Sequence, residues 1–149
     1  MKYLEDLVVG KKDSFGSYLV TREAVLEFAS KYDPQPFHLD DAAAAATYFG
    51  RLSASGWHTC SMVMRMFVDN MSRTKIAGMG SPGVDEIRWI KPVYPGDTLR
   101  VETECLEVRP SRSKPDIGSH HSRATIFNQH DEVVMTMISI GIIKRRPVA

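Results

Sequence analysis

Residues 56–71 constrain the fold more than any other part of the chain, because they have helical spacing and are apolar almost all the way round. Their polar side chains form one narrow stripe, made by His58, Arg65, Asp69 and Ser72. A helix with so little polar surface is typically buried on most of its sides. The sequence therefore predicts a central helix that the rest of the chain encloses.

The chain divides into a helical half and a strand half. Residues 21–72 have the spacing of helices and residues 82–144 that of strands, which favours an α+β fold over alternating βαβ units. The alternation of apolar and polar residues changes phase after Cys105, which predicts a β-bulge there. Residues 133–144 are apolar on both faces, so we expect a central strand, reached through a hairpin turn at 129–131.

The composition fits a single globular domain over residues 1–149. Hydrophobic residues make up 43% of the 149 residues and charged residues 25%, which suffices for an ordinary core. The net charge is +1, no stretch approaches the ~20 apolar residues of a membrane span, and the first residues lack a signal-peptide pattern. Cys60 and Cys105 lack CxxC spacing. We therefore expect a cytoplasmic protein with reduced cysteines, no metal, and no nucleic-acid or membrane partner.

An acid and an imidazole five residues apart form the most informative motif. Asp33 and His38 are separated by a stretch with two prolines, Pro34 and Pro36, which hold the backbone in a rigid turn. Such a turn is able to aim both side chains at one point without help from a deep core. A carboxylate and a histidine are common residues for deprotonating a water and moving a proton. Spacing alone nevertheless favours a structural pair, in which Asp33 ends a helix and His38 is a cap or core contact.

Gly56 stands at the start of the predicted central helix. A glycine there leaves its amide N–H accessible and permits close approach of a ligand. The first amides of a helix also carry partial positive charge, which suits an oxyanion forming on a thioester carbonyl. A glycine that only permits tight packing explains the residue equally well, so both interpretations stay open.

Three motifs in order resemble the MaoC-like dehydratases, also called (R)-specific enoyl-CoA hydratases. The first follows the family's order of acid, proline, apolar residue, histidine and second acid, with Asp33, Pro36, Phe37, His38 and Asp40. The second is the stretch 49–56 that leads into the central helix, and the third is the strand-turn-strand sequence of residues 87–99. The resemblance covers about residues 15–143.

The resemblance implies a hot-dog fold, in which an antiparallel β-sheet wraps around a central helix. It implies reversible addition of water to a 2-enoyl-CoA or enoyl-carrier-protein thioester, giving a 3-hydroxyacyl thioester. Asp33 and His38 would hold and activate the water, and the Gly56 amide would bind the thioester oxygen. Gln35 would support the aspartate region, and Ser61 the substrate pocket. No cofactor is implied beyond the CoA of the substrate, and the assembly implied is a homodimer or a higher homo-oligomer.

Two other functions remain open. The sequence departs from the family at Tyr32, Gln35 and Ser55, where a small residue, an asparagine and a histidine are usual. These departures leave room for a non-catalytic acyl-thioester-binding subunit. A hot-dog acyl-CoA thioesterase is the other alternative, and it usually carries its acid on or near the central helix. Here that helix offers only Asp69, far from Gly56.

Overall fold

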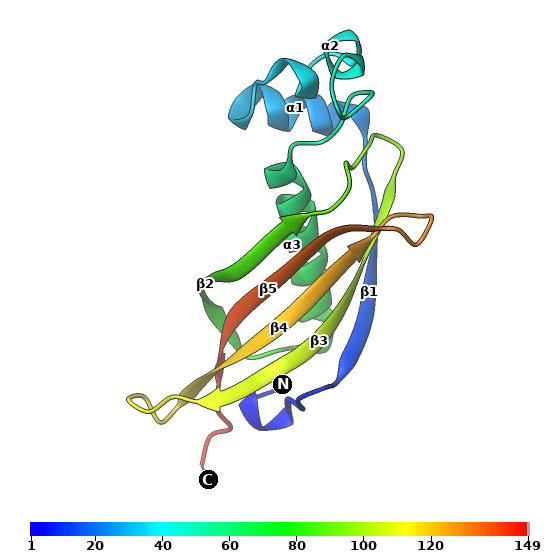
Figure 1. The fold of residues 1–149 in the computed structure, drawn as a ribbon. Helices are drawn as coiled ribbons and strands as arrows, with labels where there is room; N and C mark the ends of the chain where they lie inside the picture. The colour runs from blue at the N-terminus through cyan, green and yellow to red at the C-terminus, as the bar shows by residue number, and fades with distance from the viewer. Residues whose placement is uncertain (149) are drawn as a thin grey trace.

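The structure is a computed structural model that describes residues 1–148. Its elements follow in chain order (Figure 1): η1 (Leu4–Asp6), β1 (Lys12–Leu19), α1 (Arg22–Tyr32), η2 (Pro36–His38), α2 (Asp41–Ala45), α3 (Gly56–Thr74), β2 (Gly78–Trp89), β3 (Thr98–Pro110), β4 (Ile117–Phe127) and β5 (Val133–Lys144). No helix within the described residues is long and apolar enough to cross a membrane.

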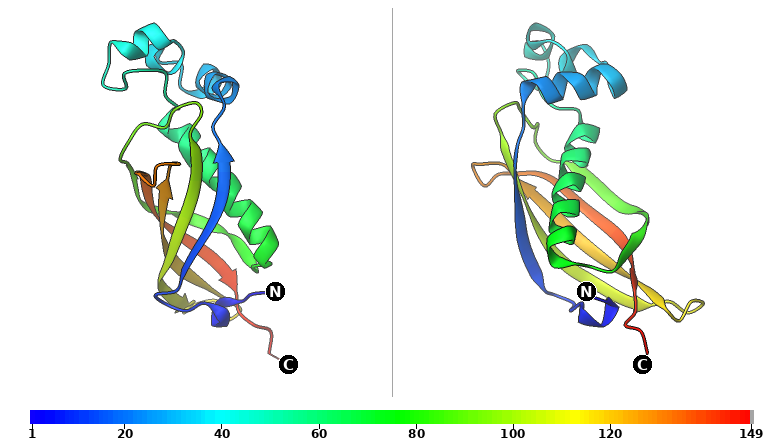
Figure 2. Two further views of the ribbon diagram at one scale, coloured as in Figure 1. Left: turned by 90° about the vertical axis from the view of Figure 1, so that its right-hand side faces the viewer. Right: turned by 180° about the vertical axis from the view of Figure 1, so that it is seen from behind.

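The five strands form one antiparallel sheet in the order β1-β3-β4-β5-β2, and the sheet curls around α3 (Figures 1 and 2). The core lies between them, where Met62 and Val63 of α3 meet Val101, Ile126 and Met135 of the strands. This arrangement confirms the predicted α+β hot-dog fold. β5 lies between β4 and β2, which confirms that it is not an edge strand.

Local sequence signals in the strand half also agree with the structure. The β3–β4 register shifts between Cys105 and Glu107, where the apolar phase predicted a bulge. β4 and β5 pair as a hairpin, and Asp131 in its turn has a positive φ of 57°. The Asn128 side chain accepts hydrogen bonds from the His130 and Glu132 amides, which supports that turn.

The surroundings of α3 differ from the prediction on one side. The sheet and α1 bury one face, which includes His58, Thr59 and Met66. The opposite face carries Trp57 and Met64, which are 59% and 50% exposed in the single chain. The views in Figure 2 show the cause, because the sheet covers only one side of the helix. His58 therefore does not belong to an exposed polar stripe, and the apolar residues opposite it have no cover within this chain.

α1, η2 and α2 sit together beyond the N-terminal end of α3 (Figure 1). α1 begins at an N-cap, Thr21, whose hydroxyl accepts a hydrogen bond from the Ala24 amide at 3.2 Å. α2 begins at Asp40, whose carboxylate accepts from the Ala43 amide at 2.9 Å. These caps fix where the chain turns and bring the segment between α1 and α2 next to the start of α3.

Candidate active site

The segment between α1 and α2 places the predicted acid and imidazole side by side. Pro34 ends α1, because a proline disfavours helical backbone at the residue before it, and Asp33 leaves the helix at φ −149° and ψ 65°. Pro36 then opens the short helix η2, which ends at His38. As a result, His38 Nε2 lies 3.6 Å from Asp33 Oδ2.

His38 is held in one tautomer by a backbone carbonyl. Its Nδ1 lies 2.8 Å from the carbonyl oxygen of Ser53, and because a carbonyl only accepts, Nδ1 carries the proton in the neutral ring. Nε2 is then left with a lone pair on the side of Asp33. The distance of 3.6 Å is too long for a direct hydrogen bond. The pair is therefore suited to contact one water or hydroxyl group together.

The packing of His38 corrects one expectation. The side chain does not project from a rigid turn away from the core, because His38 is only 5% exposed. Its ring lies 4.7 Å from the Phe37 ring and 5.5 Å from the Phe49 ring, measured between centroids. The histidine is thus at once a core contact and the neighbour of Asp33.

Asp33 is kept ionised by its neighbours. Burial raises the pKa of its carboxyl, but hydrogen bonding by Ser55 and Gln35 and the charge of a protonated His38 lower it by more, so the pKa lies below its usual range. Gln35 Nε2 donates to Asp33 Oδ1 at 2.7 Å. A carboxylate held in this way is a weak base that orients its neighbours. The lone pair on His38 Nε2 is better suited to accept a proton.

Ser55 is a member of the site that sequence reasoning registered only as a departure from the family pattern. It is 1% exposed and occupies the N-cap position of α3, yet its hydroxyl does not cap the helix. Among residues 1–148 the Ser55 hydroxyl has no hydrogen-bond partner at full bonding geometry. It nevertheless lies close enough to Asp33 to favour the ionised form of that carboxyl group. An unsatisfied buried hydroxyl costs about 1–3 kcal/mol. Its position beside Asp33 is thus suited to a bound water or ligand.

Gly56 follows Ser55 as the first residue of α3, and its packing requires a glycine. A Cβ at this position would lie 2.5 Å from the Cε2 atom of the Trp89 ring. The indole Nε1 also donates to the Gly56 carbonyl at 3.0 Å. Tight packing therefore explains why this residue is a glycine. Its amide is also one of the first N–H groups of the helix, which lack intrahelical acceptors. A role for that amide in binding an oxyanion stays a prediction.

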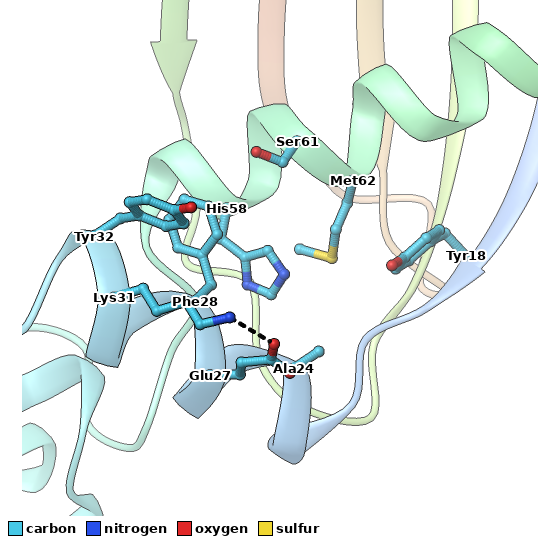
Figure 3. A pocket seen from close by; sticks show the side chains of 9 residues that line it. All are labelled: Tyr18, Ala24, Glu27, Phe28, Lys31, Tyr32, His58, Ser61 and Met62. Carbon is cyan, nitrogen blue, oxygen red and sulfur yellow. Dashed lines mark hydrogen bonds and ion pairs between the residues drawn. The ribbon is translucent and has the colours of Figure 1, made fainter.

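Ser61 lies apart from the dyad. Its hydroxyl donates back to the Trp57 carbonyl at 3.0 Å, and its side chain borders a separate cavity together with His58 and Met62 (Figure 3). The structure thus brings Asp33, Gln35 and His38 together but does not join Ser61 to them.

The comparisons with known proteins concern the family and the fold. Residues 8–125 match the family model described as "MaoC like domain". The crystal structure of the MaoC-like dehydratase from Rhodospirillum rubrum superimposes with a TM-score of 0.90 and 38% identity, over 99% of this chain and all (100%) of that one. The uncharacterized protein YdeM of Bacillus subtilis is 27% identical over 95% of this chain and 99% of its own length.

A 3-hydroxybutyryl-CoA dehydratase of Methylorubrum extorquens is 27% identical over 89% of this chain and 78% of its own length. The family match covers most of the chain, including the segment from Asp33 to His38 and the start of α3. This chain belongs to the MaoC-like dehydratase family.

Proposed function

We propose that this protein catalyses the reversible addition of water to a 2-enoyl thioester, giving a 3-hydroxyacyl thioester. The observation that carries the proposal is the pair of His38 Nε2 and Asp33 Oδ2, which face each other at 3.6 Å with the His38 tautomer fixed by Ser53. Similarity to a 3-hydroxybutyryl-CoA dehydratase supports the same class of reaction. The handle of the substrate would be CoA or an acyl carrier protein.

The chemistry follows from the environments of the two side chains. Asp33 and His38 hold the water between them, and Nε2 of His38 takes one of its protons as the oxygen bonds to C3 of the enoyl group. The C2–C3 π electrons move toward the thioester carbonyl, whose oxygen gains negative charge. The Gly56 amide at the start of α3 stabilises that oxygen. C2 then takes the proton from His38, and the ionised Asp33 stabilises the imidazolium in the meantime.

Crotonyl-CoA tests the proposal directly. Incubation with the protein is expected to remove the enoyl-thioester absorbance without release of free thiol. Thiol release without hydration would instead indicate the thioesterase alternative. Binding of crotonyl-CoA and longer enoyl-CoAs without any turnover would indicate the non-catalytic subunit.

The assembly that the resemblance implies is part of the proposal. A homodimer would bring a second chain to the open side of α3, where the acyl thioester would enter between protomers. This part is tested separately, through the mass of the protein in solution.

A further inference from the structure

The strand-turn-strand motif of residues 87–99 supplies no group to the proposed chemistry, yet its turn is tied to the segment that leads into α3. The Tyr94 hydroxyl donates a hydrogen bond to the Phe49 carbonyl at 2.6 Å. The Val93 carbonyl accepts one from the Ala54 amide at 2.8 Å. Two adjacent residues of the turn therefore hold both ends of residues 49–54.

Residues 49–54 in turn contact His38 at two places. The Phe49 ring lies 5.5 Å from the His38 ring and 5.2 Å from the Phe37 ring, measured between centroids. The Ser53 carbonyl lies 2.8 Å from Nδ1 of His38. Because His38 is only 5% exposed, these protein contacts rather than solvent set where its ring lies.

Tyr94 is itself held from several directions. Asp97 is 6% exposed, and its carboxylate accepts hydrogen bonds from the Tyr94 amide at 2.9 Å and from the Gln129 side chain at 3.0 Å. The guanidinium carbon of Arg51 lies 3.9 Å from the centroid of the Tyr94 ring, close enough for a cation–π contact. Both the backbone and the ring of Tyr94 are thus fixed, which makes its hydroxyl a stationary donor.

The segment that Tyr94 holds has no other distant tie of this kind. Thr47 donates to the Ala44 carbonyl from its amide and from its hydroxyl, and the Phe49 and Gly50 amides donate back to Thr47. Among residues 1–148, the bond from Tyr94 is the only hydrogen bond that joins residues 47–50 to a remote part of the chain. Without it, the Phe49 ring would be free to shift against His38.

We propose, building on the proposed hydration, that Tyr94 is a positioning residue for His38. Its hydrogen bond to the Phe49 carbonyl fixes the ring that packs on His38, so that Nε2 of His38 stays directed at Asp33. Tyr94 touches no reacting atom in this proposal. The turn after β2 therefore acts on the chemistry through the orientation of one imidazole.

Tyr94→Phe tests this proposal with the loss of a single hydroxyl, because it keeps the ring that Arg51 covers. We expect kcat for crotonyl-CoA hydration to fall by about tenfold, since small displacements of a catalytic group are costly in rate. KM should stay within about twofold, because the contacts of the substrate handle are unchanged. Tyr48→Phe is the matched control. Tyr48 is on the same segment, is 83% exposed, and its hydroxyl has no hydrogen bond within residues 1–148, so kcat should not change.

Two further measurements show whether Tyr94 acts through His38. In a His38→Ala background, Tyr94→Phe should cause no further loss of the residual turnover, because the group that it positions is gone. Long-range ¹H–¹⁵N NMR of histidine-labelled protein reports on His38 without any turnover. Wild type should show one tautomer with the proton on Nδ1, and Tyr94→Phe should show both tautomers.

A Tyr94→Phe protein with wild-type kcat and an unchanged His38 spectrum would overturn the proposal. So would an equal loss of turnover in the wild-type and His38→Ala backgrounds, since that indicates a general structural effect. If Tyr94→Phe fails to fold, Phe49→Leu takes its place, because it keeps the carbonyl but removes the ring against His38. Normal kcat in Phe49→Leu would then count against the proposal.

The two proposals fail separately. A His38 spectrum that changes in Tyr94→Phe, in a protein whose wild type does not hydrate enoyl-CoAs, would refute only the proposed function. Hydration by wild type that Tyr94→Phe leaves unaltered would refute only the positioning role.

Discussion

At the scale of single residues, the two members of the dyad have separate roles because their surroundings differ. Asp33 accepts a hydrogen bond from Gln35, lies beside the Ser55 hydroxyl, and its pKa is lowered, which keeps it charged and weakly basic. His38 donates from Nδ1 to a carbonyl and keeps a lone pair on Nε2. Acid–base chemistry at neutral pH requires two such groups. The surroundings of Asp33 favour its charged form, and those of His38 favour its basic form.

Substitution of the dyad separates its chemical role from its structural role. Asp33→Asn keeps the shape of the side chain and removes the carboxylate, so crotonyl-CoA turnover is expected to fall by ~10²–10⁴ while the protein still folds. His38→Ala is expected to lose turnover and also about 1–3 kcal/mol of stability, because it opens a cavity and leaves the Ser53 carbonyl without its donor. Turnover is measured per folded molecule, beside a thermal melt.

Asp69→Asn is the matched control for the dyad variants, since Asp69 is an exposed acid on α3 that pairs only with Arg65 among the described residues. It should leave both turnover and melting temperature near wild type. Normal turnover by folded Asp33→Asn protein would show that the dyad is only structural. Loss of activity in Asp69→Asn would favour the thioesterase alternative, in which the acid lies on the central helix.

Ser55→Ala is expected to raise the pKa of Asp33, because the Ser55 hydroxyl favours the ionised carboxylate. A ¹³C NMR titration of the Asp33 carboxyl measures this directly. A lowered folded-state pKa contributes stability that is present above the unfolded-state pKa and is lost as pH falls through the folded-state pKa. The unfolding free energy of wild type relative to Ser55→Ala should therefore be most favourable at neutral pH and should fall as the pH drops into the acid range. An unchanged Asp33 titration would show that Ser55 does not act on the carboxylate.

At the scale of elements, the start of α3 is locked to the end of β2. Gly56 leaves no room for a side chain against the Trp89 ring, and the indole donates to the Gly56 carbonyl. Trp57 meets the same indole edge-on, with centroids 5.3 Å apart. Trp89 therefore helps to fix the position of the helix start, next to Ser55.

Gly56→Ala tests this lock. Alanine gains up to about 1 kcal/mol of helix propensity over glycine, but its Cβ would overlap the Trp89 ring, so the variant is expected to melt below wild type. In a Trp89→Ala background the overlap is gone, and Gly56→Ala should then be neutral or stabilising. Thermal melts of the two single variants and the double variant form the cycle. A Gly56→Ala cost that is the same in both backgrounds would contradict the packing argument.

The sequence predicts the elements better than their contacts, and individual residues show why. The turn from Asp33 to His38 follows from its prolines, and the bulge after Cys105 follows from a phase shift, because both are local effects. Helical spacing places His58 in line with Arg65 and Asp69, but its burial depends on where Phe28 of a distant helix packs. The unpartnered hydroxyl of Ser55 likewise becomes visible only when the chain is folded.

At the scale of the whole molecule, one side of the single chain is apolar and has no cover. α3 exposes Trp57, Met64 and Val68 on the side away from the sheet. Strand β2 lies at the edge of the sheet and exposes Val84 and Trp89. The contact between Trp57 and Trp89 joins these two surfaces at one end. Exposed sheet edges and contiguous apolar patches are usually covered in soluble proteins.

We therefore expect a homodimer formed through α3 and the edge of β2. Light scattering after size-exclusion chromatography should give twice the chain mass of 16.7 kDa at micromolar concentration. Met64→Asp places a charge in the middle of the apolar face, so its desolvation on assembly should shift the protein to monomer. Val9→Asp is the matched control, because Val9 is 60% exposed but lies outside this face. A wild-type protein that elutes at the mass of one chain would show that this face is not the interface. So would a Met64→Asp protein that stays dimeric. Loss of crotonyl-CoA hydration in monomeric Met64→Asp would further indicate that the active site needs the second chain.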